Sequence, residues 1–278
     1  MEALILSDLL NYNSKSNFTI SFVFLPKNKR DAINLVYNWC KVSDSIVDAE
    51  LPNDRKKQFL HSWVVEFEKG LLGNSQYPIL NKLSIVIHKF QIPTEYFLDL
   101  LRGMEMDLTK NRYNNFDELE IYCYRVASTV GLICAKIFGY KNEAIEKYAI
   151  QLGKALQITN IIRDIKQDAT KGRIYIPLED LQKFNVDEKD IFENRMSDNL
   201  RKCINYQWER ANNYFLEADN LLVAEEKKGF LAAQIMEEVY YSILLKIREN
   251  NYDVFTPNLK VASYYKFKIA ISCWWKNR

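Results

Sequence analysis

The residues with the clearest chemical potential form a polar stripe in the segment LQITNIIRDIKQD, Leu156 to Asp168. Gln157, Asn160, Asp164 and Asp168 stand at offsets of 0, 3, 7 and 11. Because each residue turns an α-helix by about 100°, the later three side chains fall within roughly 60° of the first. One face of an otherwise apolar helix therefore carries two carboxylates and two amides.

A second stripe of the same kind lies earlier, in YNWCKVSDSIVD. Tyr37, Lys41, Asp44 and Asp48 stand at offsets of 0, 4, 7 and 11 and share one helical face. Like charges four residues apart repel and mildly destabilise a helix, so two helices each accept this cost. Such pairs are common on solvated faces. Here apolar residues flank both stripes, which favours a functional site: Trp39, Ile46, Val47, Ile158, Ile161, Ile162 and Ile165.

The two pairs of carboxylates predict a divalent-cation site. Carboxylate oxygens suit a hard ion, and Mg²⁺ usually takes one or two protein carboxylates together with substrate phosphate oxygens. Two facing helices of this type would hold Mg²⁺ ions around a diphosphate, and Lys41, Arg163 and Arg173 would add positive charge. A glycine loop of the Walker type and the Glu-x-x-His pairs of di-iron bundles are both missing. Two histidines, His61 and His88, are too few for a His-rich metal site.

The composition is that of an ordinary globular protein. The chain has 278 residues, 48% hydrophobic and 27% charged, with a net charge of +2, so we expect no nucleic-acid partner. Five scattered cysteines predict reduced thiols in a cytoplasmic protein. The N-terminal segment carries Glu2 and Asp8 where an export signal would be basic, and no uncharged apolar run reaches the ~18 residues of a membrane span.

Helical periodicity recurs along nearly the whole chain. Only eight glycines and six prolines interrupt it, which favours long helices and short loops. The main exception is FTISFVF, Phe18 to Phe24, which alternates as a strand would but has no obvious partner. We predict a single all-α domain over residues 1–278 with ten helices. Their expected ranges are 2–13, 27–49, 53–71, 78–90, 94–109, 116–139, 142–168, 197–222, 229–250 and 258–275.

Three blocks of the sequence resemble the squalene/phytoene synthase family, the head-to-head prenyltransferases. They are YNWCKVSDSIVD (Tyr37 to Asp48), YCYRVASTVG (Tyr122 to Gly131) and LGKALQITNIIRDIKQDATKGRIYIP (Leu152 to Pro177). The similarity runs from about residue 18 to about residue 250. Within the family, SFVFLP near the start and GMEMDLT at 103–109 look most like the bacterial presqualene diphosphate synthases.

The resemblance implies an isoprenoid-synthase-type helical bundle with a central apolar cavity, several Mg²⁺ ions and prenyl diphosphate substrates. It assigns metal binding and catalysis to Asp44, Asp48, Asp164 and Asp168, with Asn160 beside them and Tyr122 handling the cyclopropyl intermediate. It assigns diphosphate binding to Lys41, Arg163, Arg173, Asn160, Gln157, Asn17 and Thr19. For the substrate cavity we name the aromatic residues Phe18, Phe22 and Tyr37, with Phe24 as a further candidate for stabilising a cation.

The sequence departs from the family pattern at several of these positions. Lys41 stands where an arginine is frequent, which keeps the charge but loses bidentate phosphate contact. Ser45 replaces a second aspartate, Ser128 replaces a glycine, and Asn17 and Thr19 replace serines. The DxxxD spacing survives, so the metal site is expected to persist.

The activity implied is Mg²⁺-dependent condensation of two farnesyl diphosphates to presqualene diphosphate, without NADPH. Alternatives within the family are 15-cis-phytoene synthesis from two geranylgeranyl diphosphates and dehydrosqualene synthesis. A head-to-tail or cyclising terpene enzyme would share the metal chemistry but not the YCYRVASTVG block. A non-catalytic assembly factor is the alternative from another class, and the four retained aspartates speak against it.

The C-terminal segment YYKFKIAISCWWKNR mixes aromatic residues with lysines, as segments at a membrane surface do. A last helix docked on the core explains Trp274 and Trp275 equally well. Peripheral contact with the inner face of the membrane is therefore one of two expectations for this segment. The sequence makes no prediction of the oligomeric state.

Overall fold

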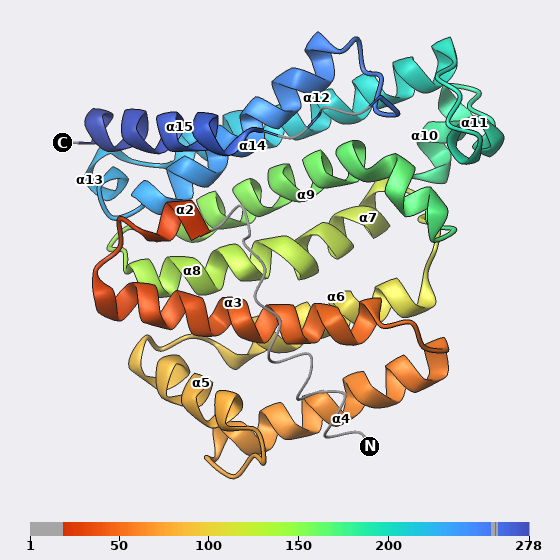
Figure 1. Ribbon diagram of the computed structural model, residues 1–278. Helices are drawn as coiled ribbons and strands as arrows, with labels where there is room; N and C mark the ends of the chain where they lie inside the picture. Colours follow the sequence, from red (N-terminus) through yellow and green to blue (C-terminus); the bar gives the residue numbers. More distant parts are fainter. Residues whose placement is uncertain (1–18, 257–258, 260, 278) are drawn as a thin grey trace.

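A computed structural model describes residues 19–256, 259 and 261–277 of the chain. Its helices form a stack, with α4 and α5 at one end, then α3 and α6, then α7, η1 and α8, then α9, and finally α12, α14 and α15 (Figure 1). The all-α class predicted from the sequence is confirmed, and the described residues contain no strand. The helices are α2 (Thr19–Phe22), α3 (Lys27–Asp48), α4 (Asn53–Leu71), α5 (Pro78–Lys89), α6 (Thr94–Thr109), α7 (Phe116–Cys123), η1 (Tyr124–Ser128), α8 (Thr129–Phe138), α9 (Ala144–Thr170), α10 (Leu178–Lys183), α11 (Glu188–Phe192), α12 (Asp198–Leu221), α13 (Ala224–Lys227), α14 (Leu231–Glu249) and α15 (Ser263–Lys276).

Prolines set where several of these helices begin. Pro26, Pro52 and Pro93 directly precede α3, α4 and α6, and Pro177 precedes α10. Proline fixes φ near −65° and has no N–H to donate, which suits the start of a helix. The predicted bounds of 53–71 and 94–109 are confirmed, and the prolines account for where these two helices begin.

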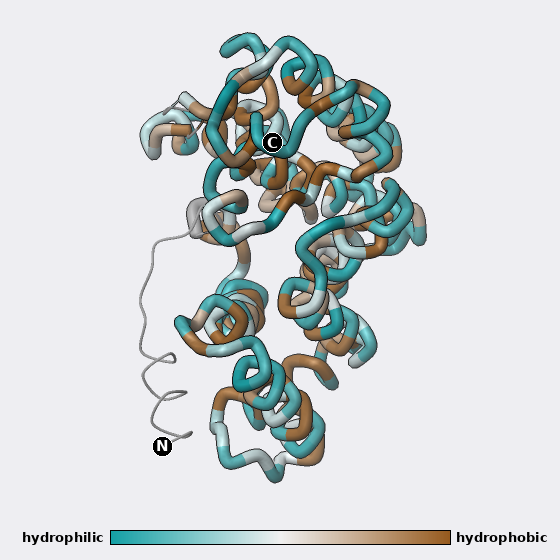
Figure 2. The backbone as a smooth tube through the Cα atoms, turned by 90° about the vertical axis from the view of Figure 1, so that its right-hand side faces the viewer, coloured by the Kyte–Doolittle hydropathy of each residue, from teal (hydrophilic) through white to brown (hydrophobic). Residues whose placement is uncertain are grey.

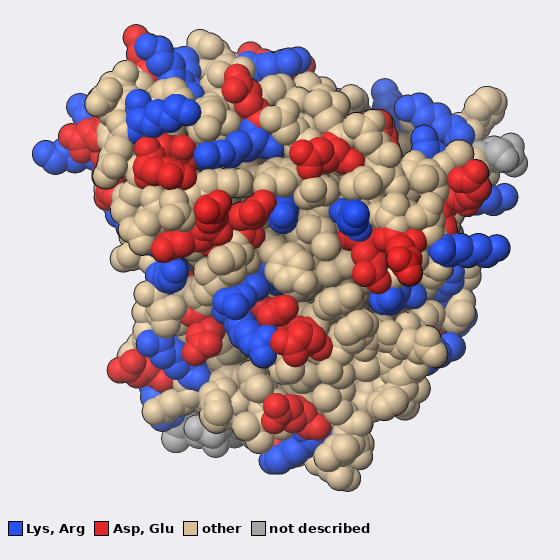
Figure 3. Space-filling model, turned by 180° about the vertical axis from the view of Figure 1, so that it is seen from behind, with Lys and Arg blue, Asp and Glu red and all other residues tan. Residues whose placement is uncertain are grey.

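The hydrophobic core lies between the layers because the helices turn their apolar faces inward. Trp39 is fully buried on α3, with its ring 5.6 Å from that of Phe67 and 5.2 Å from that of Phe97. Hydrophobic and hydrophilic residues alternate in bands along the helices, as amphipathic helices require (Figure 2). Acidic and basic side chains are intermingled over the face opposite to that of Figure 1, in keeping with a net charge of +2 (Figure 3).

Three features differ from the sequence prediction. The strand-like segment contains the helical turn α2, since the described residues offer no strand to pair with it. The predicted helix 116–139 is interrupted by the π-helical η1, and the short helices α10, α11 and α13 were not predicted. The last helix begins at Ser263 rather than at residue 258. The predicted helix 2–13 lies outside the described residues.

The continuous segment Phe116–Phe138 has the length and apolar composition of a membrane span. Half of its apolar window is buried against other helices. A buried helix of the core has the same composition, and the contacts of this segment with α6 and α9 are those of a core helix.

Close backbone contact joins η1 to α9. A Cβ atom added at Gly153 would lie 2.5 Å from Ser128 Cα and 2.7 Å from Ser128 N. Ser128 is fully buried and donates a hydrogen bond of 2.8 Å to the carbonyl oxygen of Ile150. Ser128, one of the departures from the family pattern, therefore links η1 to α9, the helix that carries the polar stripe from Gln157 to Asp168.

We expect Gly153→Ala to destabilise the protein by about 1–3 kcal/mol, because the new methyl group meets backbone rather than a side chain that can move. Thermal unfolding followed by circular dichroism measures the effect. Gly229→Ala is the matched control, since its nearest neighbour is at 3.5 Å. Equal melting temperatures for the two variants would contradict this account of the crossing.

Candidate active site

An apolar cavity of about 390 Å³ lies inside the bundle, which is a usual size for a site that binds a small molecule. Its walls come from six parts of the fold: α2, α3, α6, the segment α7–η1–α8, α9 and α14. The central apolar cavity expected from the sequence is therefore present.

The cavity is polar at one end and apolar at the other. Along α3 the lining residues change from Ile33 to Asp44, and along α9 from Tyr148 to Asn160. From the rise of 1.5 Å per residue, the lined part of α9 is about 18 Å long. The carboxylates and amides thus stand together where both helices approach their C-terminal ends, and the opposite end is hydrocarbon.

Both polar stripes point toward the polar end. Asp44, Gln157 and Asn160 line the cavity itself. Asp48 closes α3, one turn beyond Asp44, and its Oδ1 lies 2.8 Å from Nζ of Lys171, just past the end of α9. That ion pair joins the ends of the two stripe-bearing helices.

The remaining carboxylates of the second stripe follow Asn160 along the same face of α9. Asp164 accepts a hydrogen bond of 2.8 Å from Arg163 Nε. Asp168 lies one turn further on and is half-buried. The structure therefore brings the four predicted aspartates to the same end of the bundle.

Asp44 and Asp168, one on each stripe, have raised pKa values. Enclosure by protein, together with the charges of Asp48 and Asp107, raises the pKa of Asp44 to about 7. Burial and the neighbouring Asp164 raise the pKa of Asp168 to about 7, and Arg173 opposes this shift. The side chain of Asp44 is accessible from the cavity but surrounded by the walls. The two stripes therefore share one electrostatic field, in which negative charge is poorly compensated.

Asp107 on α6 is a further member of this cluster, and the sequence analysis did not single it out. Its carboxylate accepts hydrogen bonds from Tyr175 (2.7 Å) and Tyr122 (3.1 Å), and its pKa is raised by burial. Arg173 donates to the carbonyl oxygen of Asp107 at 2.9 Å. A lone acidic residue on an apolar helix face in GMEMDLT was the available signal, but without a second carboxylate at helical spacing it predicts nothing specific.

Tyr122 is buried at the cavity wall as a neutral phenol. Burial, followed by the charge of Asp107, raises its pKa well above the ordinary value. Its ring stacks on Tyr175 at 5.2 Å and lies 5.6 Å from Tyr113. The hydroxyl group is thus held in place and donates its proton to Asp107.

The other predicted residues are placed as follows. Phe22 and Tyr37 line the cavity, whereas Phe24 packs beside Ile235 and Ala270 on the outer side of α14. The assignment of Phe24 as a cation-stabilising aromatic residue is therefore wrong. Asn17 and Phe18 lie outside the described residues, and Thr19 begins α2. Lys41 lies on α3, one turn before Asp44.

The residues at the polar end fit Mg²⁺ held jointly with a diphosphate. Asn160 Oδ1 is buried and accepts no hydrogen bond from the described residues, so an oxygen ligand is available there. The raised carboxylate pKa values are those of a site that lacks positive charge. Within the part of the chain that the structure describes, no three His, Cys, Asp or Glu side chains form a ligand cluster by themselves. The remaining ligands of Mg²⁺ would thus come from phosphate and water.

An all-α bundle around an apolar cavity with acidic helices at one end defines the isoprenoid-synthase class. Residues 12–265 match the family model described as Squalene/phytoene synthase. The chain is 33% identical to a phytoene synthase of Arthrospira platensis, covering 90% of this chain and 85% of that protein. It is 32% identical to a 15-cis-phytoene synthase of Synechococcus elongatus, over the same shares of the two chains.

The fold is also similar to solved structures of synthases named for dehydrosqualene and squalene. The fold matches a dehydrosqualene synthase with a TM-score of 0.83 and 28% identity, covering 100% of this chain and 97% of the other. It matches a squalene synthase of Alicyclobacillus acidocaldarius with a TM-score of 0.78 and 27% identity, over 91% and 95% of the two chains. The chain belongs to the squalene/phytoene synthase family, and the family supports an enzyme of the prenyl-transferring type.

The raised pKa of Asp44 predicts how metal-free stability depends on pH. The Asp44 carboxyl has a pKa of about 7 in the folded protein and its ordinary pKa of 3.8 in the unfolded chain. Between these values the folded state holds more protons, so its contribution to stability falls as the pH rises through this window. Between pH 5 and pH 8 the melting temperature of Asp44→Asn should therefore fall less than that of the wild type. At pH 8 the variant should have the higher melting temperature.

Thermal melts without divalent cations, in matched buffers, measure this effect. Asp31→Asn is the control, because Asp31 is an exposed carboxylate on the same helix and outside the cavity. A slope that Asp44→Asn leaves undiminished would show that Asp44 does not hold a proton in the folded protein.

Proposed function

We propose that this protein condenses two farnesyl diphosphates head to head, with Mg²⁺, to presqualene diphosphate and free diphosphate. One observation supports this most directly: Asp44, Gln157 and Asn160 stand at the polar end of an otherwise apolar cavity. Such a cavity suits a substrate with a charged head and a long hydrocarbon tail.

The charged heads would lie at the acidic end. Asp44 and Asp48 on α3, and Asp164 and Asp168 on α9, would hold them through Mg²⁺, which neutralises the charge that develops on departing diphosphate. Lys41, Arg163 and Arg173 would add direct contacts to phosphate oxygens. Lys171 and Arg163 pair with Asp48 and Asp164 in the present structure, so two of the four carboxylates already have a cation beside them, and Asp44 and Asp168 carry the raised pKa values.

The reaction begins when the C–O bond of one substrate breaks and leaves an allylic cation. The C2=C3 bond of the second substrate attacks this cation, a carbon–carbon bond forms, and loss of a proton closes the cyclopropane ring. The released diphosphate is the proton acceptor we propose. Tyr122 is a poor acceptor, because its phenol is neutral and already donates to Asp107. We assign Tyr122 the role of fixing the wall beside the intermediate.

The walls would protect the cation from water. Phe22 is buried at the cavity, and Tyr37 and Tyr122 present further rings. Aromatic faces stabilise a cation electrostatically, and an apolar enclosure prevents its quenching to an alcohol.

The apolar end of the cavity favours the shorter substrate. Phe230 closes it, with its ring 5.4 Å from that of Phe138 and 6.0 Å from that of Tyr148, both edge to face. Phe138 borders the cavity on one side and a surface hollow that includes Glu226 on the other. Since this ring separates the tail site from the surface, we propose that it limits the tail to fifteen carbons. The names of the relatives from Arthrospira and Synechococcus favour phytoene synthesis from C20 substrates as the second candidate.

Incubating the purified chain with Mg²⁺ and farnesyl diphosphate, without NADPH, should give presqualene diphosphate. Mass spectrometry after phosphatase treatment identifies the product as its alcohol. Phytoene formed preferentially from the C20 diphosphate would establish the second candidate instead. No condensation product from either substrate would refute both and return the protein to a non-catalytic role.

In the same assay Asp44→Asn and Asp164→Asn should each lower turnover by roughly a hundredfold or more, because each removes charge that holds the departing diphosphate. Asp31→Asn is again the control, and circular dichroism shows that the variants are folded. Near-wild-type turnover in either variant would rule out the two-helix metal site.

Phe138→Ala should shift chain-length selection toward C20 by about tenfold or more, since each methylene excluded from an apolar pocket is worth about that factor. Offering C15 and C20 diphosphates in equal amounts and weighing the products measures the ratio. Ile137→Ala is the matched control, a buried neighbour that does not line the cavity. An unchanged ratio in folded Phe138→Ala would show that this ring does not set the length.

A further inference from the structure

The last helix, α15, carries an apolar stripe on its outer side. Tyr264, Phe267, Ile271 and Trp275 stand at offsets of 0, 3, 7 and 11, so they lie within about 80° of one another around the helix. Their exposed fractions are 68%, 59%, 42% and 70%. We call these four residues the outer stripe. Exposed large apolar residues are ordinary when scattered, but four on one face of one helix form a patch.

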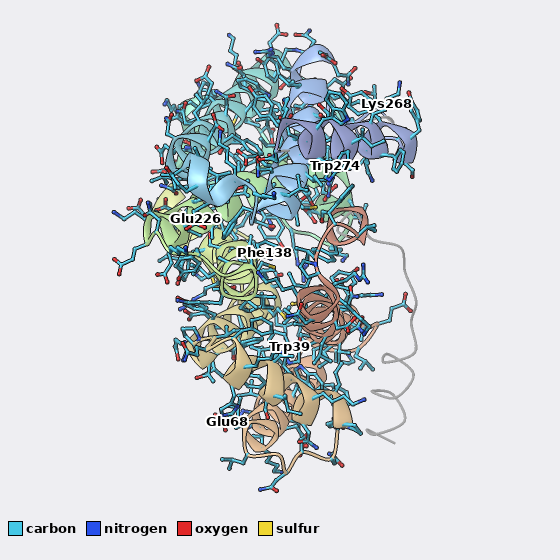
Figure 4. The ribbon with its side chains drawn as sticks, turned by 90° about the vertical axis from the view of Figure 1, so that its left-hand side faces the viewer. Trp39, Glu68, Phe138, Glu226, Lys268 and Trp274 are labelled. Carbon is cyan, nitrogen blue, oxygen red and sulfur yellow. The ribbon has the colours of Figure 1, made fainter. Side chains whose placement is uncertain are left out.

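The inner side of α15 has a separate set of contacts. Ala270 and Cys273 are buried against Ile235 of α14, and Trp274 is partly buried. Figure 4 shows Trp274 toward the body of the protein and Lys268 on the outer side of the helix. Docking on the core thus explains Trp274 but leaves Trp275 and the rest of the outer stripe unexplained.

The charges on α15 are of one sign. The helix carries Lys266, Lys268 and Lys276 and no aspartate or glutamate. Lys268 is exposed beside the outer stripe, and Lys276 lies 3.9 Å from Glu238 of α14. Tyrosine and tryptophan on an apolar face, bordered by lysine, match the polarity profile of a bilayer surface with anionic headgroups.

The position of α15 adds a further reason. It packs against α14 and α2, the two elements that supply Met236, Tyr240 and Phe22 to the cavity wall. Val23, next to the cavity-lining Phe22, is 64% exposed. The outer stripe therefore lies one helix away from the apolar cavity.

We propose that α15 is a membrane-docking helix, lying in the headgroup region of an anionic bilayer with the outer stripe buried among the acyl chains. The exposed Lys268 and Lys276 contact lipid phosphates and the outer stripe supplies apolar area, whereas Lys266 is half-buried near Arg163 and takes no part. This inference does not rest on the proposed reaction, because the stripe and its charges lie outside the catalytic cavity.

Sedimentation of the full chain with vesicles tests the proposal. Vesicles of equal parts phosphatidylglycerol and phosphatidylcholine should bind the protein, and pure phosphatidylcholine should bind it more weakly. Phe267→Ser with Trp275→Ser should weaken binding at least tenfold. Lys268→Gln with Lys276→Gln should weaken binding to the anionic vesicles and reduce its sensitivity to salt.

The matched control is Leu72→Ser with Leu216→Ser, which removes two large apolar side chains that are 78% and 54% exposed elsewhere on the surface. It should bind as the wild type does. All substituted residues are exposed, so the melting temperatures should be equal and folding is not in question. Wild-type protein that binds neither vesicle, or a stripe variant that binds as tightly as the wild type, would overturn the proposal. A dimer that forms without lipid and depends on the stripe would assign this face to a second copy of the chain instead.

Discussion

The structure depends on keeping several carboxylates together at the edge of an apolar cavity. Asp44 and Asp168 stand on different helices, yet both have a pKa near 7 because other carboxylates and protein walls surround them. Isolated helices would avoid such spacing. The packing of the bundle holds these groups in place, and the cost is recovered only when positive charge enters. An arrangement that is unfavourable without its ligands is what a binding site for a cation and diphosphate requires.

Local features of the bundle serve this arrangement. Prolines fix the starts of α3 and α6, and the contact between Gly153 and Ser128 fixes where α9 crosses η1. The π-helical η1 lines the cavity directly, through Val126 and Ala127, and π-helical turns are frequently found at functional sites. Tyr122 lies beside Asp107 because η1, which directly follows the helix that carries it, packs against α6. The acidic cluster is thus assembled from three helices, although the sequence displays it as two separate stripes.

This difference explains how much the sequence was able to predict. Spacing within one helix is a local property, so the stripes on α3 and α9 and the bounds of α4 and α6 were predictable from periodicity and proline positions. Asp107 was not, since its partners Tyr122 and Tyr175 are 15 and 68 residues away and are joined to it only by packing. The same reason accounts for Phe24. Its position away from the cavity is set by its packing against α14 and α15, which the local sequence does not show. The turn α2 follows from the absence of a partner strand among the described residues.

The molecule carries two departures from ordinary helix patterning, and they are complementary. On α3 and α9 polar stripes face a largely apolar cavity, and on α15 an apolar stripe faces outward, so the departures are of two kinds. Folding alone favours neither, since burying carboxylates and exposing large apolar side chains both oppose stability. The polar stripes become favourable when cations and phosphate bind to them. The outer stripe on α15 becomes favourable when it contacts an apolar surface. A substrate with a diphosphate head and a polyprenyl tail has one part suited to each environment. The helices α14 and α2 lie between the outer stripe and the cavity. In the layered stack, α15 with its apolar stripe lies in the outermost layer, and the acidic site lies between the inner helices α3, α6 and α9.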